Sequence, residues 1–96
     1  MKPLDPDEVL LEGRWIKAGS KVVADDAAHR IEELVSFQLT KLAVSEDGWE
    51  ALYVDKRDGR FWELSYPHRD WHGGGPPSLR NVTKEYAEKK YRPVEE

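Results

Sequence analysis

Apolar residues recur at helical spacing in the middle of the first half of the chain. They stand at Ala27, Ala28, Ile31, Leu34, Val35, Leu39 and Leu42. A stripe with this period is typical of an amphipathic helix. Asp25 suits the N-cap, because its carboxylate can accept from exposed N–H groups of the first turn. The pattern predicts a helix over residues 25–38, with Arg30, Glu32 and Glu33 on its polar face.

Elsewhere the pattern alternates with a period of two, which is typical of half-buried strands. Residues 11–24 fit a hairpin around the turn Gly19-Ser20, since apolar and β-branched residues flank that turn. Further strands are predicted over residues 41–44, 49–55, 60–66 and 78–82. The turn 56–59 places Gly59 where a left-handed residue is needed.

Together these elements predict an α+β fold. An antiparallel sheet of about five to six strands packs one face on the helix, and a short C-terminal helix over residues 84–91 lies along the surface behind a Thr83 cap. Ninety-six residues suggest one domain, 1–96. Residues 1–8 are expected to form an extended lead-in, and residues 92–96 a tail.

The four tryptophans divide into two groups. Trp15, Trp49 and Trp62 stand in strand-like runs, and large aromatic side chains in such runs usually fill the core. Trp71 stands in a loop, where packing under the loop and anchoring a partner are equally compatible with the sequence. Tryptophan is enriched among the residues that dominate binding interfaces.

That loop contains the segment Gly73, Gly74, Gly75, Pro76 and Pro77, which no helix or strand can hold. Consecutive glycines permit positive φ angles, and consecutive prolines fix φ and remove two N–H donors. The segment therefore predicts a structural loop with a backbone-defined shape. Binding residues are often found on loops that a rigid scaffold positions.

The overall composition limits the classes of function. The chain holds 15 Lys and Arg against 19 Asp and Glu, a net charge of −4, with −5 on residues 1–50 and +1 on residues 51–96. An acidic balance disfavours nucleic acid, where phosphate neutralisation dominates affinity, and favours a basic protein surface. There is no apolar run of membrane-spanning length, no secretory signal core and no cysteine. A cytoplasmic location is therefore expected.

The loop histidines do not indicate a metal or cofactor site. His68 and His72 have the spacing of two ligands on a helix, but Pro67 and Gly73 flank them and no cysteine completes a zinc set. The glycine run lacks the Lys-Ser/Thr pair of a phosphate loop. We therefore expect neither a metal nor a cofactor.

Two other functions remain open from the residues alone. Glu63, Asp70 and His72 supply the groups that a small acid–base hydrolase needs, although no nucleophile motif accompanies them. A sheet that binds single-stranded RNA is the other alternative. It requires Trp62 and Tyr53 to be exposed beside basic residues.

An ordered series of short motifs resembles a known family. The motifs are Gly13-x-Trp15, Val23-Ala24-Asp25, Arg30-Ile31-Glu32, Asp47-Gly48-Trp49-Glu50-x-Leu52-Tyr53, Asp58-Gly59-Arg60-x-Trp62-Glu63-Leu64-x-Tyr66-Pro67 and His72-Gly73-Gly74-Gly75-Pro76-Pro77. In this order they resemble the bacterial immunity protein 27 family, over about residues 8–91. The resemblance implies a cytoplasmic antidote, encoded beside a polymorphic toxin, that binds and blocks the toxin domain. It implies no catalytic residues.

For a binding protein of this kind, the loop and the acidic turns are the predicted contact residues. We expect Arg69, Asp70, Trp71 and His72 of the loop, with Glu46, Asp47 and Asp58 in the turns, to face a basic toxin that is held by stoichiometric occlusion. The sequence leaves the oligomeric state and the toxin's activity open.

Overall fold

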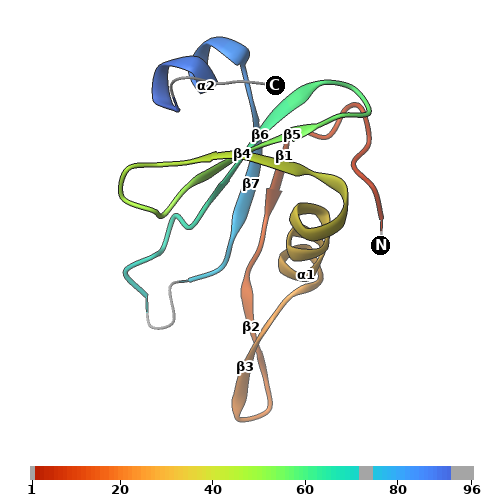
Figure 1. The fold of residues 1–96 in the computed structure, drawn as a ribbon. Coiled ribbons are helices and arrows are strands. Elements are labelled where there is room, and N and C mark those ends of the chain that lie inside the picture. The colour runs from red at the N-terminus through yellow and green to blue at the C-terminus, as the bar shows by residue number, and fades with distance from the viewer. Residues whose placement is uncertain (1, 72–74, 92–96) are drawn as a thin grey trace.

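The computed structural model describes residues 2–71 and 75–91, and its centre is a five-stranded antiparallel sheet. The strand order is β1-β7-β6-β5-β4 (Figure 1). The strands are β1 (Leu10–Glu12), β4 (Thr40–Val44), β5 (Ala51–Asp55), β6 (Arg60–Ser65) and β7 (Ser78–Val82). The α+β prediction is thus confirmed, with five strands in the main sheet.

The predicted helix is also confirmed, and its last turn is wider than an α-helix. α1 (Asp26–Glu33) continues directly into the π-helical turn η1 (Leu34–Gln38). The Asp25 carboxylate accepts a 2.8 Å hydrogen bond from the Ala28 N–H, which is the N-cap contact that the sequence predicts. At the other end the Leu39 N–H donates to the Leu34 carbonyl, five residues back.

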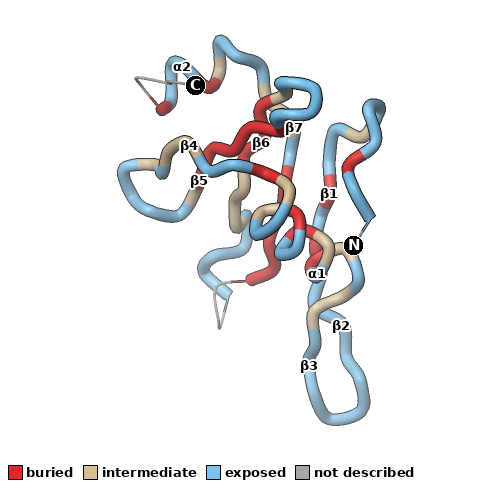
Figure 2. Tube along the Cα trace, turned by 45° about the vertical axis from the view of Figure 1, so that its right-hand side comes forward, coloured by how far each residue is buried: buried red, intermediate tan, exposed pale blue. Residues whose placement is uncertain are grey.

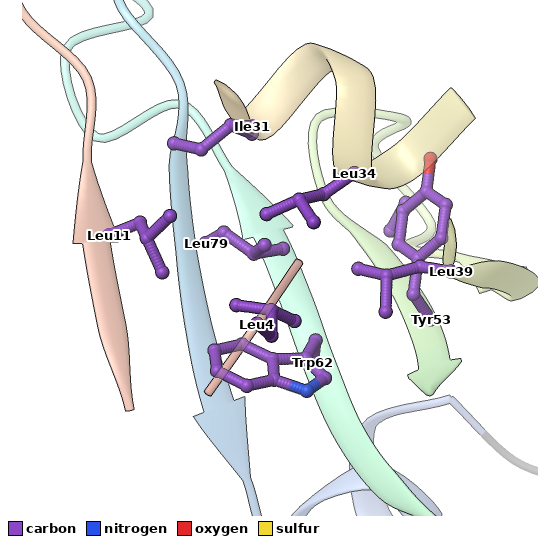
Figure 3. Packing of buried hydrophobic residues seen from close by; sticks show 9 residues of the cluster. Leu4, Leu11, Ile31, Leu34, Leu39, Tyr53, Trp62 and Leu79 are labelled. Carbon is purple, nitrogen blue, oxygen red and sulfur yellow. The ribbon is translucent and has the colours of Figure 1, made fainter. Parts of the chain in front are cut away.

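The main core lies between this helix and one face of the sheet. Figure 3 shows Ile31 and Leu34 pointing from the helix toward Leu79 of β7. Trp62 and Tyr53 are direct cross-strand partners on this face and are buried. These two strands therefore place an aromatic pair in the core, and the shared burial fixes which face of each strand points inward.

The opposite face of the sheet is covered at one end by α2 (Lys84–Lys90). The Thr83 hydroxyl caps α2 by accepting from the Tyr86 N–H. A second cluster joins Leu52, Val54 and Phe61 of the sheet to Ala87 and Tyr91. The C-terminal helix therefore closes a small core of its own instead of lying on the surface.

The predicted hairpin is a separate two-stranded sheet, and its predicted bounds were wrong at the start. β2 (Trp15–Ala18) pairs with β3 (Lys21–Ala24), whereas Leu11 and Glu12 belong to β1 and pair with β7. The hairpin extends away from the body of the molecule (Figure 1) and is exposed along nearly its whole length (Figure 2).

The N-terminal lead-in is held by arginines. Arg30 donates to the Glu8 carboxylate at 2.6 and 2.8 Å and to the carbonyls of Lys2 and Pro3. Arg57 donates to the carbonyl of Leu4, which is buried. Arg30, which the sequence placed on the polar face of the helix, thus holds the N-terminal segment against α1. Within the described residues, no helix has the length and apolar character needed to cross a bilayer.

Candidate partner-binding surface

One end of the main sheet gathers three connecting segments. β5 begins beside the end of β6, β7 begins beside the end of β6, and β1 ends beside the start of β7. The β4–β5 turn, the loop after β6 and the base of the β2–β3 hairpin are therefore neighbours. The β5–β6 turn and the end of η1 lie at the other end, where Gln38 donates to Asp55.

Three of the four tryptophans are exposed at this first end. Trp15 is 37% exposed, Trp49 41% and Trp71 48%, whereas Trp62 is fully buried. The core prediction for Trp15 and Trp49 was wrong. Trp15 lies in the hairpin outside the main sheet, and Trp49 precedes β5, which begins at Ala51. We call the surface around Trp15, Trp49 and Trp71 the tryptophan end.

The loop tryptophan is held by its own turn. The Trp71 N–H donates to the His68 carbonyl at 2.9 Å, and the two rings stack with centroids 4.1 Å apart and planes 12° from parallel. Beside them is an open groove of about 350 Å³. Its walls are Glu12, Arg14, Trp15, His68, Trp71 and Pro76.

The β4–β5 turn is held beside this loop. Arg69 approaches Asp47 at 3.9 Å, and the Asp47 carboxylate accepts from the Trp49 N–H and the Ser45 hydroxyl. These two hydrogen bonds, Trp49 first, lower the pKa of Asp47. The Trp49 ring meets the Tyr66 ring edge-on, with centroids 6.2 Å apart, so the acidic turn and the loop form one surface.

Close backbone packing shapes the far side of the loop. Gly75 has φ +72°, and a Cβ there would lie 2.3 Å from the His68 carbonyl oxygen, so only glycine fits. Pro76 and Pro77 are buried. Gly73, Gly74 and His72 lie outside the described residues. The Gly13 N–H donates to the Pro77 carbonyl at 2.8 Å, which joins the loop to the base of the hairpin.

The structure brings together most of the predicted contact residues but not all of them. Asp47 and Arg69 are paired, and Glu46, Asp70 and Trp71 adjoin them in the same two turns. Asp58 is at the opposite end of the sheet, in the β5–β6 turn, where its carboxylate accepts from Arg60. A single compact interface at the tryptophan end therefore leaves Asp58 out.

Both carboxylate oxygens of Glu63, the acid–base group of the hydrolase alternative, accept hydrogen bonds. It is buried, and it accepts from Arg80, Tyr86 and Tyr91 and pairs with Lys90 at 2.8 Å. Burial alone would raise the pKa of Glu63, but the hydrogen bonds from Lys90, Tyr91 and Arg80 outweigh burial and lower it. A carboxylate stabilised in its charged form and surrounded by donors is a poor proton acceptor.

The burial of two aromatic side chains excludes the RNA-binding alternative. It requires Trp62 and Tyr53 to be exposed, and both are buried under α1 and η1. Among residues 2–71 and 75–91, no group of three or more His, Cys, Asp or Glu side chains could hold a metal ion. Three exposed aromatic side chains gather at the tryptophan end.

Comparison with known families decides between the remaining functions. The family model for immunity protein 27 matches residues 17–83, more than two thirds of the chain. The chain belongs to the immunity protein 27 family. No curated protein and no solved structure matches it.

Membership of the immunity protein 27 family implies a cognate toxin as partner. Immunity proteins of polymorphic toxin systems have a cognate toxin as partner and are typically not catalytic. The matched span includes Trp49 and Trp71 together with most of the hairpin. Sequence reasoning missed Trp15 and Trp49 as surface residues, although the short hairpin strands and the turn residues before Trp49 were visible signals.

Proposed function

We propose that the protein neutralises its cognate toxin by stoichiometric occlusion, with the tryptophan end as the contact surface. The single observation that carries this proposal is the exposure of Trp15, Trp49 and Trp71 at one end of the sheet. Tryptophan at the centre of an interface contributes disproportionately to binding energy. Exposed aromatic side chains gathered on one surface are typical of an interaction site.

The required affinity is compatible with a surface of this size. An antidote must hold its toxin almost completely, which calls for nanomolar affinity, or about 12 kcal/mol. A standard interface takes about 800 Å² from each partner. The described protein exposes 6394 Å², so such an interface would use about one eighth of that surface. The β4–β5 turn adjoins the loop through Asp47 and Arg69, and the loop adjoins the base of the hairpin through Pro77 and Gly13, so the three segments can contribute to one interface.

The acidic residues of the tryptophan end indicate the charge of the toxin surface that they would contact. Glu46, Asp47 and Asp70 are exposed around Trp49 and Trp71. We expect the part of the toxin that meets them to be basic, because complementary charge steers association. We also propose that the protein acts in the cytoplasm, where an antidote protects the producing cell.

Co-expression tests this function in living cells. The toxin domain encoded beside this protein is expressed with the wild type, with Trp71→Ala plus Asp70→Ala, or with Phe37→Ala. Phe37 is 80% exposed at the opposite end of the molecule, so it is a matched aromatic control. We expect survival with the wild type and with Phe37→Ala, and loss of protection with the double variant.

Equal protection by all three proteins at equal abundance would exclude the tryptophan end as the contact surface. Failure of the wild type to protect would exclude neutralisation of that toxin. Folding of each variant is checked by circular dichroism, so loss of protection cannot come from loss of structure.

A further inference from the structure

The β2–β3 hairpin carries uncovered apolar side chains on both of its faces. Directly opposite residues of an antiparallel pair point to the same side. Trp15 and Val22 therefore share one face, while Ile16 and Val23 share the other. All four side chains are exposed, Val22 at 65% and Ile16 at 48%. Among residues 2–71 and 75–91, the body of the protein covers each face only in part, since Trp15 and Val23, one on each face, remain 37% exposed.

The charge of the hairpin is opposite to that of the rest of the chain. Residues 13–24 contain Arg14, Lys17 and Lys21 and no acidic residue. The hairpin therefore carries +3, whereas the whole chain carries −4, which leaves −7 for all other residues. Lys17 points to the Trp15 face and Lys21 to the Ile16 face, so each face combines apolar and basic side chains.

The exposed apolar side chains on both faces of the hairpin indicate the shape of its binding partner. A flat partner surface could bury one face of a two-stranded sheet and would leave the other in water. A lone two-stranded hairpin is at best marginally stable in water, so covering both faces would stabilise it most. Four-residue strands reach about 13 Å at about 3.3 Å per residue, which is enough to enter a cleft.

We propose that the β2–β3 hairpin inserts into an acidic, apolar-walled cleft of the toxin domain. This inference rests on the proposed function and adds the chemistry of the partner at one part of the tryptophan end. Lys17 and Lys21 meet carboxylates on the two walls of the cleft, and the four exposed apolar side chains fill it. A nucleic acid is a poorer occupant, because the remaining −7 of the chain would repel it.

Association kinetics with a charge-matched control test the proposal. Lys21→Glu reverses a charge beside the hairpin turn, and Lys56→Glu makes the same change in the β5–β6 turn at the opposite end. The probe is the catalytically inactivated toxin domain encoded beside this protein. At low salt we expect Lys21→Glu to slow association at least about tenfold and Lys56→Glu less than about twofold. The difference should shrink in about 0.5 M salt.

Zero-length cross-linking reports the contacts themselves. A carbodiimide joins a lysine amine directly to a carboxylate that touches it. In the complex with the wild-type protein we expect cross-links from Lys17 and Lys21 to Asp or Glu of the toxin, found by mass spectrometry. Cross-links of Lys56 to the toxin are not expected.

The outcomes separate this inference from the proposed function. If the toxin binds, Trp71→Ala weakens binding, and Lys21→Glu behaves like Lys56→Glu without hairpin cross-links, the inference is wrong and the proposed function stands. If the wild type does not bind the toxin, the proposed function itself fails. If Lys21→Glu instead abolishes binding to a DNA or RNA fragment and leaves toxin binding unchanged, the hairpin has a nucleic-acid partner and the inference is overturned.

Discussion

The Trp71 indole lies almost flat against the His68 imidazole, with ring centroids 4.1 Å apart and planes inclined by 12°. The same two residues close a turn through a 2.9 Å backbone hydrogen bond. Trp71 is therefore held in one orientation although nearly half of its surface is exposed. A side chain that is already ordered loses less conformational entropy on binding.

Replacing His68 tests this pre-organisation. We expect His68→Ala to weaken toxin binding about threefold to tenfold, which is roughly the loss of ordering one side chain, with little change in stability because both rings are exposed. His68→Phe keeps an aromatic partner for Trp71 and should bind nearly as the wild type does. The measurement is the dissociation rate of the inactivated toxin. Equal dissociation rates for His68→Ala and the wild type would show that the His68–Trp71 stack does not contribute to toxin binding.

A substitution at the buried Gly75 tests the shape of the loop without changing any exposed side chain. Gly75→Ala places a Cβ 2.3 Å from the His68 carbonyl oxygen, whereas Gly59 has a similar φ of +79° with nothing within 4 Å of the added atom. Gly59→Ala should therefore cost about 1 kcal/mol of unfolding free energy from strain alone. Gly75→Ala should cost more and should also weaken toxin binding.

Urea unfolding and toxin titration of the two glycine variants provide the measurement. If Gly75→Ala and Gly59→Ala lose the same stability and bind the toxin equally, the close approach of Gly75 to His68 does not shape the loop.

The carboxylate of Glu63 fixes α2 to the sheet. Tyr91 donates to it at 2.6 Å, and Lys90 bridges it to Glu50 at 2.8 and 2.6 Å. A hydrogen bond to a buried charged group contributes about 1.5–3 kcal/mol, so Tyr91→Phe should lower the free energy of unfolding by about that amount. Glu63→Gln removes the charged partner of Arg80 and one of the two charged partners of Lys90, and should cost about 1.5 kcal/mol or more.

Tyr91→Phe should not change toxin affinity in the folded state, because Tyr91 and the Glu63 carboxylate that it donates to are both buried. Chemical denaturation measures the first effect and calorimetric titration the second. A stability within about 0.5 kcal/mol of the wild type for Glu63→Gln would contradict the structural role of this carboxylate.

The Glu8–Arg30 pair predicts a specific loss of stability in acid. The Arg30 hydrogen bonds lower the pKa of Glu8 from 4.5 to about 2. The folded state therefore holds the charged form more strongly, and this stabilisation is complete above pH about 4.5 and disappears as the pH falls toward about 2. Glu8→Gln should be less stable than the wild type at neutral pH, and the difference should vanish near pH 2.

The relevant quantity is the difference in unfolding free energy between wild type and Glu8→Gln at a series of pH values. Taking the difference removes the contributions of Asp55 and Glu63, whose pKa values are also lowered. A difference that stays constant between pH 5 and pH 2 would contradict the pairing.

The regular elements could be predicted because local pattern determines them. Asp25 and the apolar stripe after it specify α1, and the alternation around Gly59 specifies β5 and β6. The wider η1 turn has no counterpart in that pattern. It depends on Leu39 donating back to Leu34, where the helix must end above the start of β4.

The candidate surface was only partly predictable, because exposure depends on which strands join the main sheet. Trp15 alternates like a core strand residue, yet its strand pairs only with β3 and stays outside the sheet. Asp47 and Asp58 look equivalent in sequence, since both are acidic residues of tight turns. Strand direction alone places them at opposite ends of the sheet.

Calorimetric titration of the inactivated toxin domain tests the central claim most directly. The proteins compared are the wild type, Trp71→Ala and Phe37→Ala, which truncate exposed aromatic side chains at opposite ends of the molecule. We predict a 1:1 complex of nanomolar affinity for the wild type and for Phe37→Ala, and a loss of at least about thirtyfold, or about 2 kcal/mol, for Trp71→Ala. Unchanged affinity of Trp71→Ala, or weaker binding only for Phe37→Ala, would contradict the assignment of the tryptophan end as the toxin-binding surface.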